Sequence, residues 1–409
     1  MDMVFVYEDK IAQDTEGNYY TGSAFSQEVF DRYLRHFDHI TLLMRKADID
    51  PKDTESLNKM NRLCCDRIDV VILPNPSASL RSYADPRVHA RFRQTVLREL
   101  TADRAVIIRA PSSSGTIAAD YCHAHGIPYL AEAVGCPWDS LWNHSIKGKV
   151  LAPGAWRKFR RTMRNADYAV YVTGRFLQRR YPSGGKCVSI SDVELQSVND
   201  SVLDRRLEKI RRHSGKIKIG TAGALHVPYK GQRYMMEALA KLKRQGNTRL
   251  EYHLAGGGDA SALQRHAKQL GVADQVVFDG VLRHDQMFDW FDHLDVYIQP
   301  STVESMPRAL IEAMSRGLPA LGSRVGDIPE LLGEDCVFAR KDADSIAVKL
   351  SQLSAEQMRS MANRNFRYAG QFRKELLEKK RADFYADYAA KVKEQQERAG
   401  KSSCFRKSF

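Results

Sequence analysis

The sequence has no apolar run that approaches the ~20 residues of a membrane-spanning helix. Its first nine residues include acidic side chains where a secretion signal carries cations and an apolar core, so we expect no signal peptide. The seven cysteines are scattered and include no Cys-x-x-Cys pair, which argues against a disulfide framework and against a zinc site. These absences predict a cytoplasmic protein with reduced thiols.

The composition is that of an ordinary folded protein rather than a disordered or fibrous one. Hydrophobic residues make up 43% of the 409 positions and charged residues 28%, which is close to the average for globular proteins. The length predicts two or three domains. Basic residues number 63 and acidic residues 50, so the net charge of +13 requires an acidic partner or surface to explain it.

Short β-branched apolar runs alternate with amphipathic stretches, as expected for buried parallel strands joined by helices. In the first half such runs cover residues 4–6, 39–43, 70–73, 105–108, 129–131 and 168–172, with amphipathic stretches at 28–37 and 88–100. In the second half they cover residues 217–220, 251–255, 276–278, 296–298 and 320–322, with amphipathic stretches at 232–244 and 260–270. A polar stretch at residues 191–215 separates the two series.

This pattern predicts an α/β protein with two Rossmann-like, doubly wound parallel sheets. We expect residues 1–200 to form an N-terminal domain and residues 201–370 to form a C-terminal domain. For residues 371–409 we expect a helix, which can cross back to the N-terminal domain, and a frayed basic tail.

Glycine-rich turns follow the first two strands of the second half. The Gly223 turn leads to Lys230-Gly231 before a helix, where glycine lets the backbone approach a phosphate and lysine supplies a compact cation. Taken alone, this motif is weak and fits a turn with a solvated lysine better than a phosphate site. The Gly256-Gly257-Gly258-Asp259 turn lacks the spacing of a dinucleotide fingerprint, which disfavours NAD binding.

The most informative segment is residues 299–317. Ser305 suits an N-cap and Pro307 an early helical position, so we expect a helix that begins just after Glu304. Its free N–H groups and positive end would form an anion site, and Glu312 can accept hydrogen bonds from a diol. The segment therefore favours a ligand with both phosphate and hydroxyl groups, such as a nucleotide-sugar. The alternative is a capped surface helix with two solvated glutamates.

The spacing Glu304-x7-Glu312, together with the unbroken segment at 305–319, resembles the family-4 glycosyltransferases. These are retaining enzymes of the GT-B fold, in which two Rossmann-like domains face each other across a cleft. The resemblance implies that residues 1–200 bind the acceptor of the transfer reaction and residues 201–370 bind the donor. The similarity reaches from the N-terminal loop to about residue 340 and is strongest over residues 215–335. It implies a hexosyltransferase-type enzyme, and residues 129–144 resemble transferases of bacterial capsule and exopolysaccharide biosynthesis.

The resemblance also implies roles for individual residues. Glu304 and Lys230 are the expected catalytic residues, because Glu304 would contact the donor sugar and Lys230 the diphosphate. The expected donor-binding residues are Gly22, Gly223, Lys230, Leu282, Arg283, Glu304, Ser305, Met306, Pro307 and Glu312. Among these, Glu312 would bind the ribose and Leu282-Arg283 would pack near the nucleobase. Residues 20–23 look like the flexible glycine loop of the family.

Three departures from the family pattern affect the binding of phosphate and acceptor. Ala224 stands where the family often has arginine, and His226 is a candidate replacement for that cation. Val134 replaces the cleft histidine of the family, and Gly22 is single where the family has two glycines. The residues expected on the acceptor side are Arg109, Glu132 and Asp139.

The resemblance implies retention of configuration, with a diphosphate oxygen of the donor taking the proton of the acceptor. We expect no cofactor and no metal, because Lys230 and the helix start supply positive charge, and we expect a UDP- or GDP-sugar donor. Asp-x-Asp triplets occur at 48–50 and 342–344. Both lie in polar, turn-like stretches, which argues against a metal-dependent GT-A enzyme.

The basic excess is concentrated in one stretch. Residues 141–190 contain eleven lysines and arginines and one acid, Asp167. Within residues 147–164, Trp156, Phe159 and Met163 recur at helical spacing beside cations, which suits a helix on an anionic membrane surface. A core-facing apolar stripe with a solvated basic face fits equally well. No RNA-binding or helix-turn-helix motif accompanies the charge, so we expect no nucleic-acid partner.

These features predict a peripheral protein on the inner face of the cell membrane, with a lipid-linked saccharide as acceptor. Two competing functions remain open. One is a nucleotide-sugar epimerase or a phosphorylase of the same fold, and incubation with donor alone would reveal an epimerised product. The other is a basic, membrane-binding scaffold with an inactive transferase fold, which would bind donor without turnover.

Overall fold

The computed structural model describes residues 1–22, 25–196 and 199–406, and the chain divides into two compact units. Unit 1 contains Met1–Val172, Leu177–Ile190 and Lys379–Phe409. Unit 2 contains Thr173–Phe176 and Ser191–Glu378. The chain therefore passes between the units more than once, and its C-terminal segment belongs with the N-terminal unit.

Unit 1 is built on a nine-stranded sheet. Its parallel strands lie in the order β5 (Ile68–Leu73), β3 (Ile40–Lys46), β1 (Met3–Gln13), β6 (Ala105–Ala110), β7 (Tyr129–Ala133), β8 (Tyr168–Tyr171) and β9 (Lys186–Ser189). The expected parallel sheet is confirmed, because the apolar runs form its central strands. β2 (Tyr19–Thr21) pairs antiparallel with the end of β1 and with β4 (Asn61–Arg62).

The β2 strand corrects one expectation. Tyr20 and Thr21 were expected in a flexible loop, but they pair with Ala12 and Ile11 of β1. A tight turn closed by the side chain of Asp14, which accepts the N–H of Asn18 at 2.8 Å, folds this segment back onto β1. Gly22 follows the strand directly, and Ser23 of the same expected loop lies outside the described residues.

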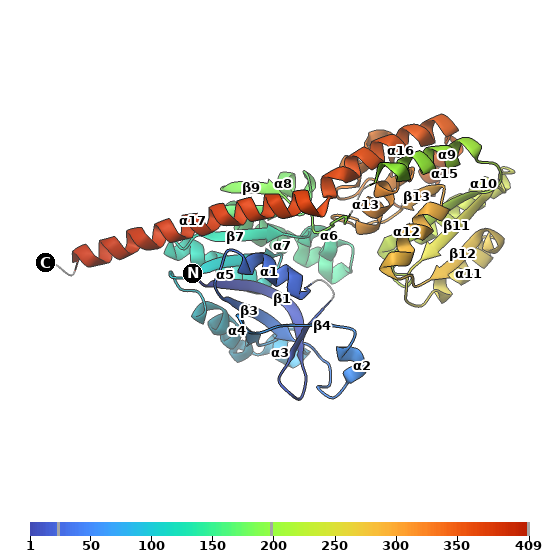
Figure 1. The fold of residues 1–409 in the computed structure, drawn as a ribbon. Coiled ribbons are helices and arrows are strands. Elements are labelled where there is room, and N and C mark those ends of the chain that lie inside the picture. Colours follow the sequence, from blue (N-terminus) through green and yellow to red (C-terminus); the bar gives the residue numbers. More distant parts are fainter. Residues whose placement is uncertain (23–24, 197–198, 407–409) are drawn as a thin grey trace. The chain divides into compact units, whose positions relative to one another are not determined.

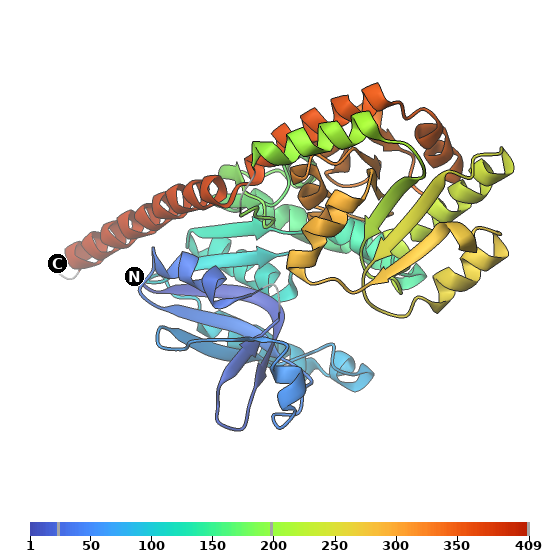
Figure 2. The same cartoon turned by 45° about the vertical axis from the view of Figure 1, so that its right-hand side comes forward.

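Helices flank the sheet of unit 1. They are α1 (Gln27–Leu34), α2 (Thr54–Leu57), α3 (Leu80–Ala84), α4 (Pro86–Arg98), α5 (Ser113–His125), α6 (Pro137–Trp142), α7 (Ile146–Arg164) and α8 (Phe176–Arg180). The C-terminal α17 (Lys374–Arg406) joins them, and its end extends past the sheet in both views (Figures 1 and 2). The Tyr388 hydroxyl of α17 accepts the N–H of Val106 at 2.9 Å, so this helix is fastened to β6.

Unit 2 contains a six-stranded parallel sheet. Its strands lie in the order β12 (Val276–Gly280), β11 (Leu250–Ala255), β10 (Ile217–Ala222), β13 (Val296–Gln299), β14 (Ala320–Ser323) and β15 (Val337–Phe338). Counted along the unit, this is the 3-2-1-4-5-6 order of a doubly wound Rossmann sheet. Every strand expected in the second half is present.

The helices of unit 2 are α9 (Asp200–Arg212), α10 (Gln232–Arg244), α11 (Ser261–Gln269), α12 (His284–His293), α13 (Arg308–Ser315), α14 (Ile328–Leu332), α15 (Ala343–Ser351) and α16 (Ala355–Ala369). Short 3₁₀ helices cover Pro228–Lys230, Ala273–Gln275, Glu334–Cys336 and Gly370–Phe372. α9 occupies the polar stretch that separates the two strand series in the sequence. It buries Val202, Arg206 and Ile210 despite its high charge.

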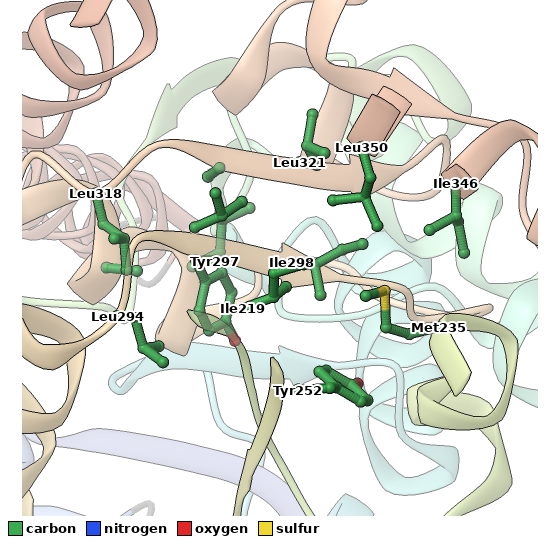
Figure 3. Close-up of a cluster of buried hydrophobic side chains, with 14 of the residues drawn as sticks. Ile219, Met235, Tyr252, Leu294, Tyr297, Ile298, Leu318, Leu321, Ile346 and Leu350 are labelled. Atoms are coloured by element: carbon green, nitrogen blue, oxygen red, sulfur yellow. The ribbon is translucent and has the colours of Figure 1, made fainter. Parts of the chain in front are cut away.

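Apolar side chains cover both faces of the unit 2 sheet (Figure 3). Ile219, Tyr297 and Ile298 come from the central strands, and Met235 and Leu350 come from the helices packed on them. Burial on both faces explains why these strands read as continuous apolar runs in the sequence.

No helix in the described ranges is both long enough and apolar enough to cross a membrane.

Candidate donor site and charged networks

The expected donor-binding residues of unit 2 gather where its sheet changes winding direction. The chain runs from β10 through β11 to β12 on one side of the sheet, and then continues with β13 on the other side. In open α/β sheets, ligands bind outside the carboxyl ends of the strands at this switch point. The loops after β10 and β13 carry Lys230 and Glu304, respectively.

Lys230 and Glu304 form the central ion pair of this region. The Nζ atom of Lys230 lies 2.7 Å from Oε1 of Glu304. The side chains retain 23% and 12% of their exposure, so the pair is partly open to solvent. Lys230 also lies 5.6 Å from the centre of the Tyr229 ring. A cation and a carboxylate that are both positioned and accessible suit a charged, hydroxylated ligand.

Buried polar side chains fix the position of the Glu304 carboxylate. The Ser301 hydroxyl donates to Oε1 of Glu304 at 3.1 Å, and the Gln299 side-chain amide donates to it at 3.4 Å. The Tyr297 hydroxyl in turn donates to the Gln299 amide oxygen at 2.9 Å. Gln299 and Ser301 are 2% and 0% exposed. Their positioning role was not predicted, although their place at the end of a buried strand is a signal that could have indicated it.

The loop at residues 301–307 corrects the expected start of the helix. α13 begins at Arg308, with Pro307 as its extended N-cap at φ −80° and ψ 103°. The expectation that Ser305 is the N-cap and Pro307 an early helical residue is wrong. A proline disfavours the helical conformation of the residue before it, so Met306 cannot enter the helix. Ser305, Met306 and Pro307 therefore belong to an irregular loop.

This loop still provides free amide groups. Among the residues that the structure describes, the backbone N–H groups of Val303, Glu304, Ser305 and Met306 have no protein acceptor. The first N–H groups of α13, beginning at Arg308, are free by the geometry of a helix start. An anion beside Lys230 can therefore receive several backbone hydrogen bonds at a positive helix end.

Two glycines hold the loop in place by close approach. Gly231 has φ +76°, and a Cβ atom there would lie 1.9 Å from the carbonyl oxygen of Pro300. Gly326 has φ +55°, and its Cβ would lie 2.1 Å from the carbonyl oxygen of Glu304. Because only glycine fits these positions, the Lys230 turn and the segment before α14 both clamp the Glu304 loop.

Glu312 lies one helical turn into α13 and is 7% exposed. Burial raises the pKa of its carboxyl group, while Arg308 and His284 partly offset this rise. The Nε2 atom of His284, at the start of α12, lies 3.8 Å from Oε1 of Glu312. Glu312 is thus a buried acceptor with a neighbouring imidazole that sequence reasoning did not identify.

The remaining donor-side residues line the edges of this region. A Cβ atom at Gly223 would lie 3.4 Å from Cδ of Lys230, so the Gly223 turn packs against the lysine stem. Leu282 packs on the core. Arg283 is largely exposed and pairs with Asp285 at 3.0 Å.

His226 is exposed and lies against Gly258, whose Cβ would come within 2.0 Å of Nδ1 of His226.

The residues expected on the acceptor side belong to unit 1, as does Gly22. Nη1 of Arg109 lies 2.9 Å from Oε2 of Glu132, and the two side chains are 14% and 4% exposed. The hydroxyls of Tyr33 and Tyr385 donate to Oε1 of Glu132 at 2.8 and 2.6 Å. Burial and then the nearby carboxylate raise the pKa of both phenols, so both remain donors at neutral pH.

Asp139 is also engaged within unit 1, because its Oδ2 atom lies 2.9 Å from Nη1 of Arg180. The carbonyl oxygen of Gly22 accepts the N–H of Phe25 at 3.0 Å and the side-chain amide of Asn61 at 2.9 Å. These contacts hold the backbone of Gly22 directly after β2. The acceptor-side roles of Arg109, Glu132 and Asp139 stay predictions.

The basic helix α7 has its cations on the exposed face and the apolar residues Phe159 and Met163 on the buried face. Phe159 and Met163 are 3% and 0% exposed, so they pack in the interior of unit 1. The prediction that the apolar side chains of this helix lie on a membrane is therefore wrong for Phe159 and Met163. The alternative, in which they face the core, is correct for these two residues. Near the start of α7, by contrast, Ile146 and Val150 are 81% and 77% exposed.

Asp342, from one of the two Asp-x-Asp triplets, caps α15 by accepting the N–H groups of Asp344 and Ser345. Within the three described ranges, no three His, Cys, Asp or Glu side chains lie together in a way that could hold a metal ion.

The comparisons with known proteins agree with this architecture. The family model described as "Glycosyl transferases group 1" matches residues 216–356, which contain the whole Lys230–Glu312 region. Protein CapJ of Staphylococcus aureus is 30% identical over 359 residues, covering 86% of this chain and 85% of CapJ. A GDP-mannose-dependent alpha-(1-6)-phosphatidylinositol monomannoside mannosyltransferase of Mycolicibacterium smegmatis is 26% identical over 54% of this chain and 62% of its own.

Among solved structures, Anabaena HepE in complex with UDP superposes with a TM-score of 0.60 at 16% identity, over 95% of this chain and all of HepE. A structure of HepE with UDP-glucose gives a TM-score of 0.57. Two parallel-sheet α/β units of this kind define the GT-B fold of glycosyltransferases. The chain belongs to the glycosyl transferases group 1 family and is a glycosyltransferase of the hexosyltransferase type.

Proposed function

We propose that the protein is a retaining glycosyltransferase that moves a sugar from a nucleotide-sugar to a lipid-linked saccharide in bacterial surface polysaccharide synthesis. The observation that carries the donor half of this proposal is the Lys230–Glu304 pair, 2.7 Å apart and partly open, beside the free amides of residues 303–306. A cation, a carboxylate and free amides at one switch point match the diphosphate and hydroxyl groups of a sugar donor.

The difficult step is cleavage of the bond between the anomeric carbon and the diphosphate. Negative charge develops on the leaving diphosphate, and Lys230 with the amides of Ser305 and Met306 would stabilise it. Donors that are already oriented need no rearrangement as this charge develops, which makes them effective. Glu304, held by Gln299 and Ser301, would bind the sugar hydroxyls and favour the positive charge that develops on the ring.

In this proposal the acceptor hydroxyl attacks from the face that the diphosphate leaves, and a diphosphate oxygen takes its proton. The new glycosidic bond forms as the bond to the diphosphate breaks, so configuration is retained and no separate base is required. Glu312 would accept hydrogen bonds from the ribose hydroxyls. The exposed side chain of Val281, beside Leu282, offers an apolar surface for the nucleobase.

Two relatives suggest which donors to test first. HepE is described with UDP-glucose, and the mannosyltransferase of M. smegmatis is named for GDP-mannose. The name of that mannosyltransferase also specifies a phosphatidylinositol mannoside, which is a lipid-linked saccharide. UDP-glucose and GDP-mannose are therefore the two donors to compare.

Attachment to an anionic membrane is supported by the surface of α7. Its cations Arg157, Lys158, Arg160, Arg161 and Arg164 are all exposed. Each cation near such a surface contributes about 1 kcal/mol to binding. Flotation with liposomes should recover more protein with anionic than with neutral lipid, and equal recovery would contradict this part of the proposal.

The donor site is tested by measuring donor hydrolysis with Glu304→Ala and Lys230→Ala. We expect kcat/KM to fall about 100-fold or more in each variant, as on removal of an oxyanion-stabilising donor. A matched control is Lys243→Ala, because Lys243 and Asp274 form a surface ion pair of the same 2.7 Å length in unit 2. Near-normal turnover of both site variants would remove the assignment, and an epimerised nucleotide-sugar would indicate the epimerase instead.

A further inference from the structure

A large hollow lies entirely within unit 1 and has no role in the donor site. Its volume is about 1010 Å³. It opens where the part of β1 that pairs with β6 ends, and its lining there includes Tyr7 and Glu8 of β1, Ala110 at the end of β6, and Pro111. The strand order places β1 and β6 side by side as the first and fourth parallel strands, so this is the switch point of the unit 1 sheet. The hollow therefore occupies the position in unit 1 where a doubly wound sheet binds its ligand.

Helices form the walls of this hollow. α5 packs between α4 and α7, and the helices are labelled in Figure 1. α4 contributes His89, Phe92 and Arg93, and α7 contributes one face that includes Leu151, Lys158 and Phe159. The lining thus combines apolar and charged side chains from several elements.

The charges at the inner end are balanced. Glu8 accepts the N–H of Ser114 near the start of α5 and pairs with Arg45. The Glu8 carboxylate therefore occupies the positive end of α5, and an anion has no place there. A carboxylate and a guanidinium that are already paired still offer hydrogen bonds to neutral hydroxyl groups. This end suits a sugar.

The charges at the rim are not all balanced. Arg161 pairs with Asp120 at 2.6 Å. Arg93 on α4 and Lys158 on α7 have no acidic side chain within ion-pair distance in the part of the chain that the structure describes. Two unpaired cations on opposite walls of one hollow suit an anionic group, such as a phosphate or a diphosphate.

An apolar strip leads away from the same rim. Leu151 lines the hollow and is 57% exposed, and Val150 and Ile146 continue from it along α7 at 77% and 81% exposure. Residues 141–166 contain no acidic side chain. The strip is thus an exposed hydrocarbon surface surrounded by cations, as expected where a lipid chain leaves a protein for an anionic membrane.

We propose that this hollow is the acceptor site and that its ligand is a saccharide joined through phosphate or diphosphate to a hydrocarbon chain. The sugar lies near Glu8 and Arg45, the phosphate between Arg93 and Lys158, and the chain along Leu151, Val150 and Ile146. This inference rests on the proposed function for the identity of its ligand as an acceptor. It replaces Arg109 and Glu132 by a different set of residues as the acceptor contacts.

The test measures direct binding of farnesyl diphosphate, a short isoprenoid diphosphate, to the full chain by titration calorimetry. We expect Lys158→Ala and Arg93→Ala each to weaken binding about tenfold, the effect of losing one charge-assisted hydrogen bond. Arg157→Ala is the matched control, because Arg157 is exposed on α7 beside Lys158 but does not line the hollow. Equal weakening by Arg157→Ala would show attraction by overall charge and would overturn the site.

Two further binding experiments test the hydrocarbon part of the ligand and distinguish the hollow from the donor site. Leu151→Ser should weaken binding of farnesyl diphosphate but leave inorganic pyrophosphate unaffected, and equal binding of the two probes would overturn the hydrocarbon part. Lys230→Ala should leave farnesyl diphosphate binding unchanged, and a loss there would place the probe at the donor site instead. Because binding needs no turnover, the hollow can be confirmed even if donor hydrolysis fails, and donor hydrolysis can succeed if the hollow fails.

Discussion

Each unit holds an ion pair between a basic side chain and a glutamate near the carboxyl ends of its parallel strands, and the two pairs differ in their surroundings. In unit 2, Oε1 of Glu304 is held by Lys230, and the neighbouring amides are free. In unit 1, Glu132 receives Arg109 and two buried phenols, which leave its carboxylate 4% exposed. The first pair can still bind a ligand, whereas the hydrogen-bonding capacity of the second is used by the protein itself.

A sequence alone does not distinguish an ion pair that can bind a ligand from an ion pair that only stabilises the fold. An ion pair at a strand end is a binding site only when accessible surface and unused hydrogen-bond donors accompany it. The pair in unit 1 instead fastens helices, because Tyr33 belongs to α1 and Tyr385 to α17. Removing one member of each pair should therefore affect different properties of the protein.

The largest effect is expected from Glu132→Ala. It removes the carboxylate that pairs with the largely buried side chain of Arg109 and that accepts from two tyrosines, so unit 1 should lose about 3–5 kcal/mol of stability. Urea unfolding followed by tryptophan fluorescence measures this, since Trp138, Trp142 and Trp156 belong to unit 1 and Trp290 alone to unit 2. The double variant Arg109→Met, Glu132→Leu should recover much of the loss.

Donor hydrolysis by the folded fraction of Glu132→Ala should stay close to wild type, because the proposed donor-binding residues of the Lys230–Glu312 region lie in unit 2. A loss of hydrolysis with unchanged stability would contradict the structural role of the Glu132 pair and would make Glu132 a functional residue.

The next effect is expected from Glu304→Gln, which keeps the size of the side chain and removes its charge. Transition-state stabilisation should fall, with kcat/KM for donor hydrolysis reduced about 100- to 1000-fold. Stability should change by about 1 kcal/mol or less, as for a partly exposed ion pair. Urea unfolding and initial rates on the same samples check both statements. A large loss of stability would mean that the Lys230–Glu304 pair stabilises the fold as the Arg109–Glu132 pair does.

The sequence indicates more of the proposed donor site than of the Glu132 network because of distance along the chain. Glu304, Ser305 and Glu312 lie within one segment, so the spacing of a single loop and helix indicates them. The partner that closes the Glu132 network, Tyr385, is 253 residues away, and no local pattern connects the two. The hollow of unit 1 likewise draws its lining from strands and helices scattered over the first 162 residues.

The errors in the predicted helices have local physical causes. Ser305 and Pro307 together are typical of a helix start, but Pro307 disfavours the helical conformation of Met306. Pro307 is itself extended, so the helix begins at Arg308. The charged stretch that contains α9 looked like an interruption because charged residues outnumber the apolar ones that face the core. Those apolar residues are Val202, Leu203, Leu207 and Ile210, and Arg206 is buried with them. The strands were predictable because burial on both faces makes them continuously apolar.

A smaller effect is expected from Gly231→Ala, which tests whether the clamp on the Glu304 loop is needed. The new Cβ would meet the carbonyl oxygen of Pro300 in a strained backbone conformation, so the loop must shift. We expect a stability loss of about 1–3 kcal/mol and a rise in the KM for donor. Gly246→Ala is the control, because Gly246 has φ +87° but no atom within 4 Å of its Cβ. A similar rise in KM in both variants would contradict the clamp.

The smallest effect is expected from Glu312→Gln, in which stability and donor binding should move in opposite directions. Burial raises the pKa of Glu312 in the folded protein above its usual 4.5, so the folded state holds this proton more tightly than the unfolded state. The wild type therefore loses stability as pH rises through the raised pKa. Glutamine removes this loss, so the variant should melt at a higher temperature than wild type near neutral pH and at the same temperature at low pH.

Donor binding should show the reverse preference, because the ionised carboxylate is the better acceptor for ribose hydroxyls. The KM of wild type for donor should rise as pH falls through the raised pKa of Glu312, whereas the KM of Glu312→Gln should be about tenfold higher near neutral pH and independent of pH over that window. Melting curves and initial rates across pH 4–8 measure both. If the variant gains stability but keeps the wild-type KM, Glu312 is a buried charge without a ligand, and the donor site ends at Glu304.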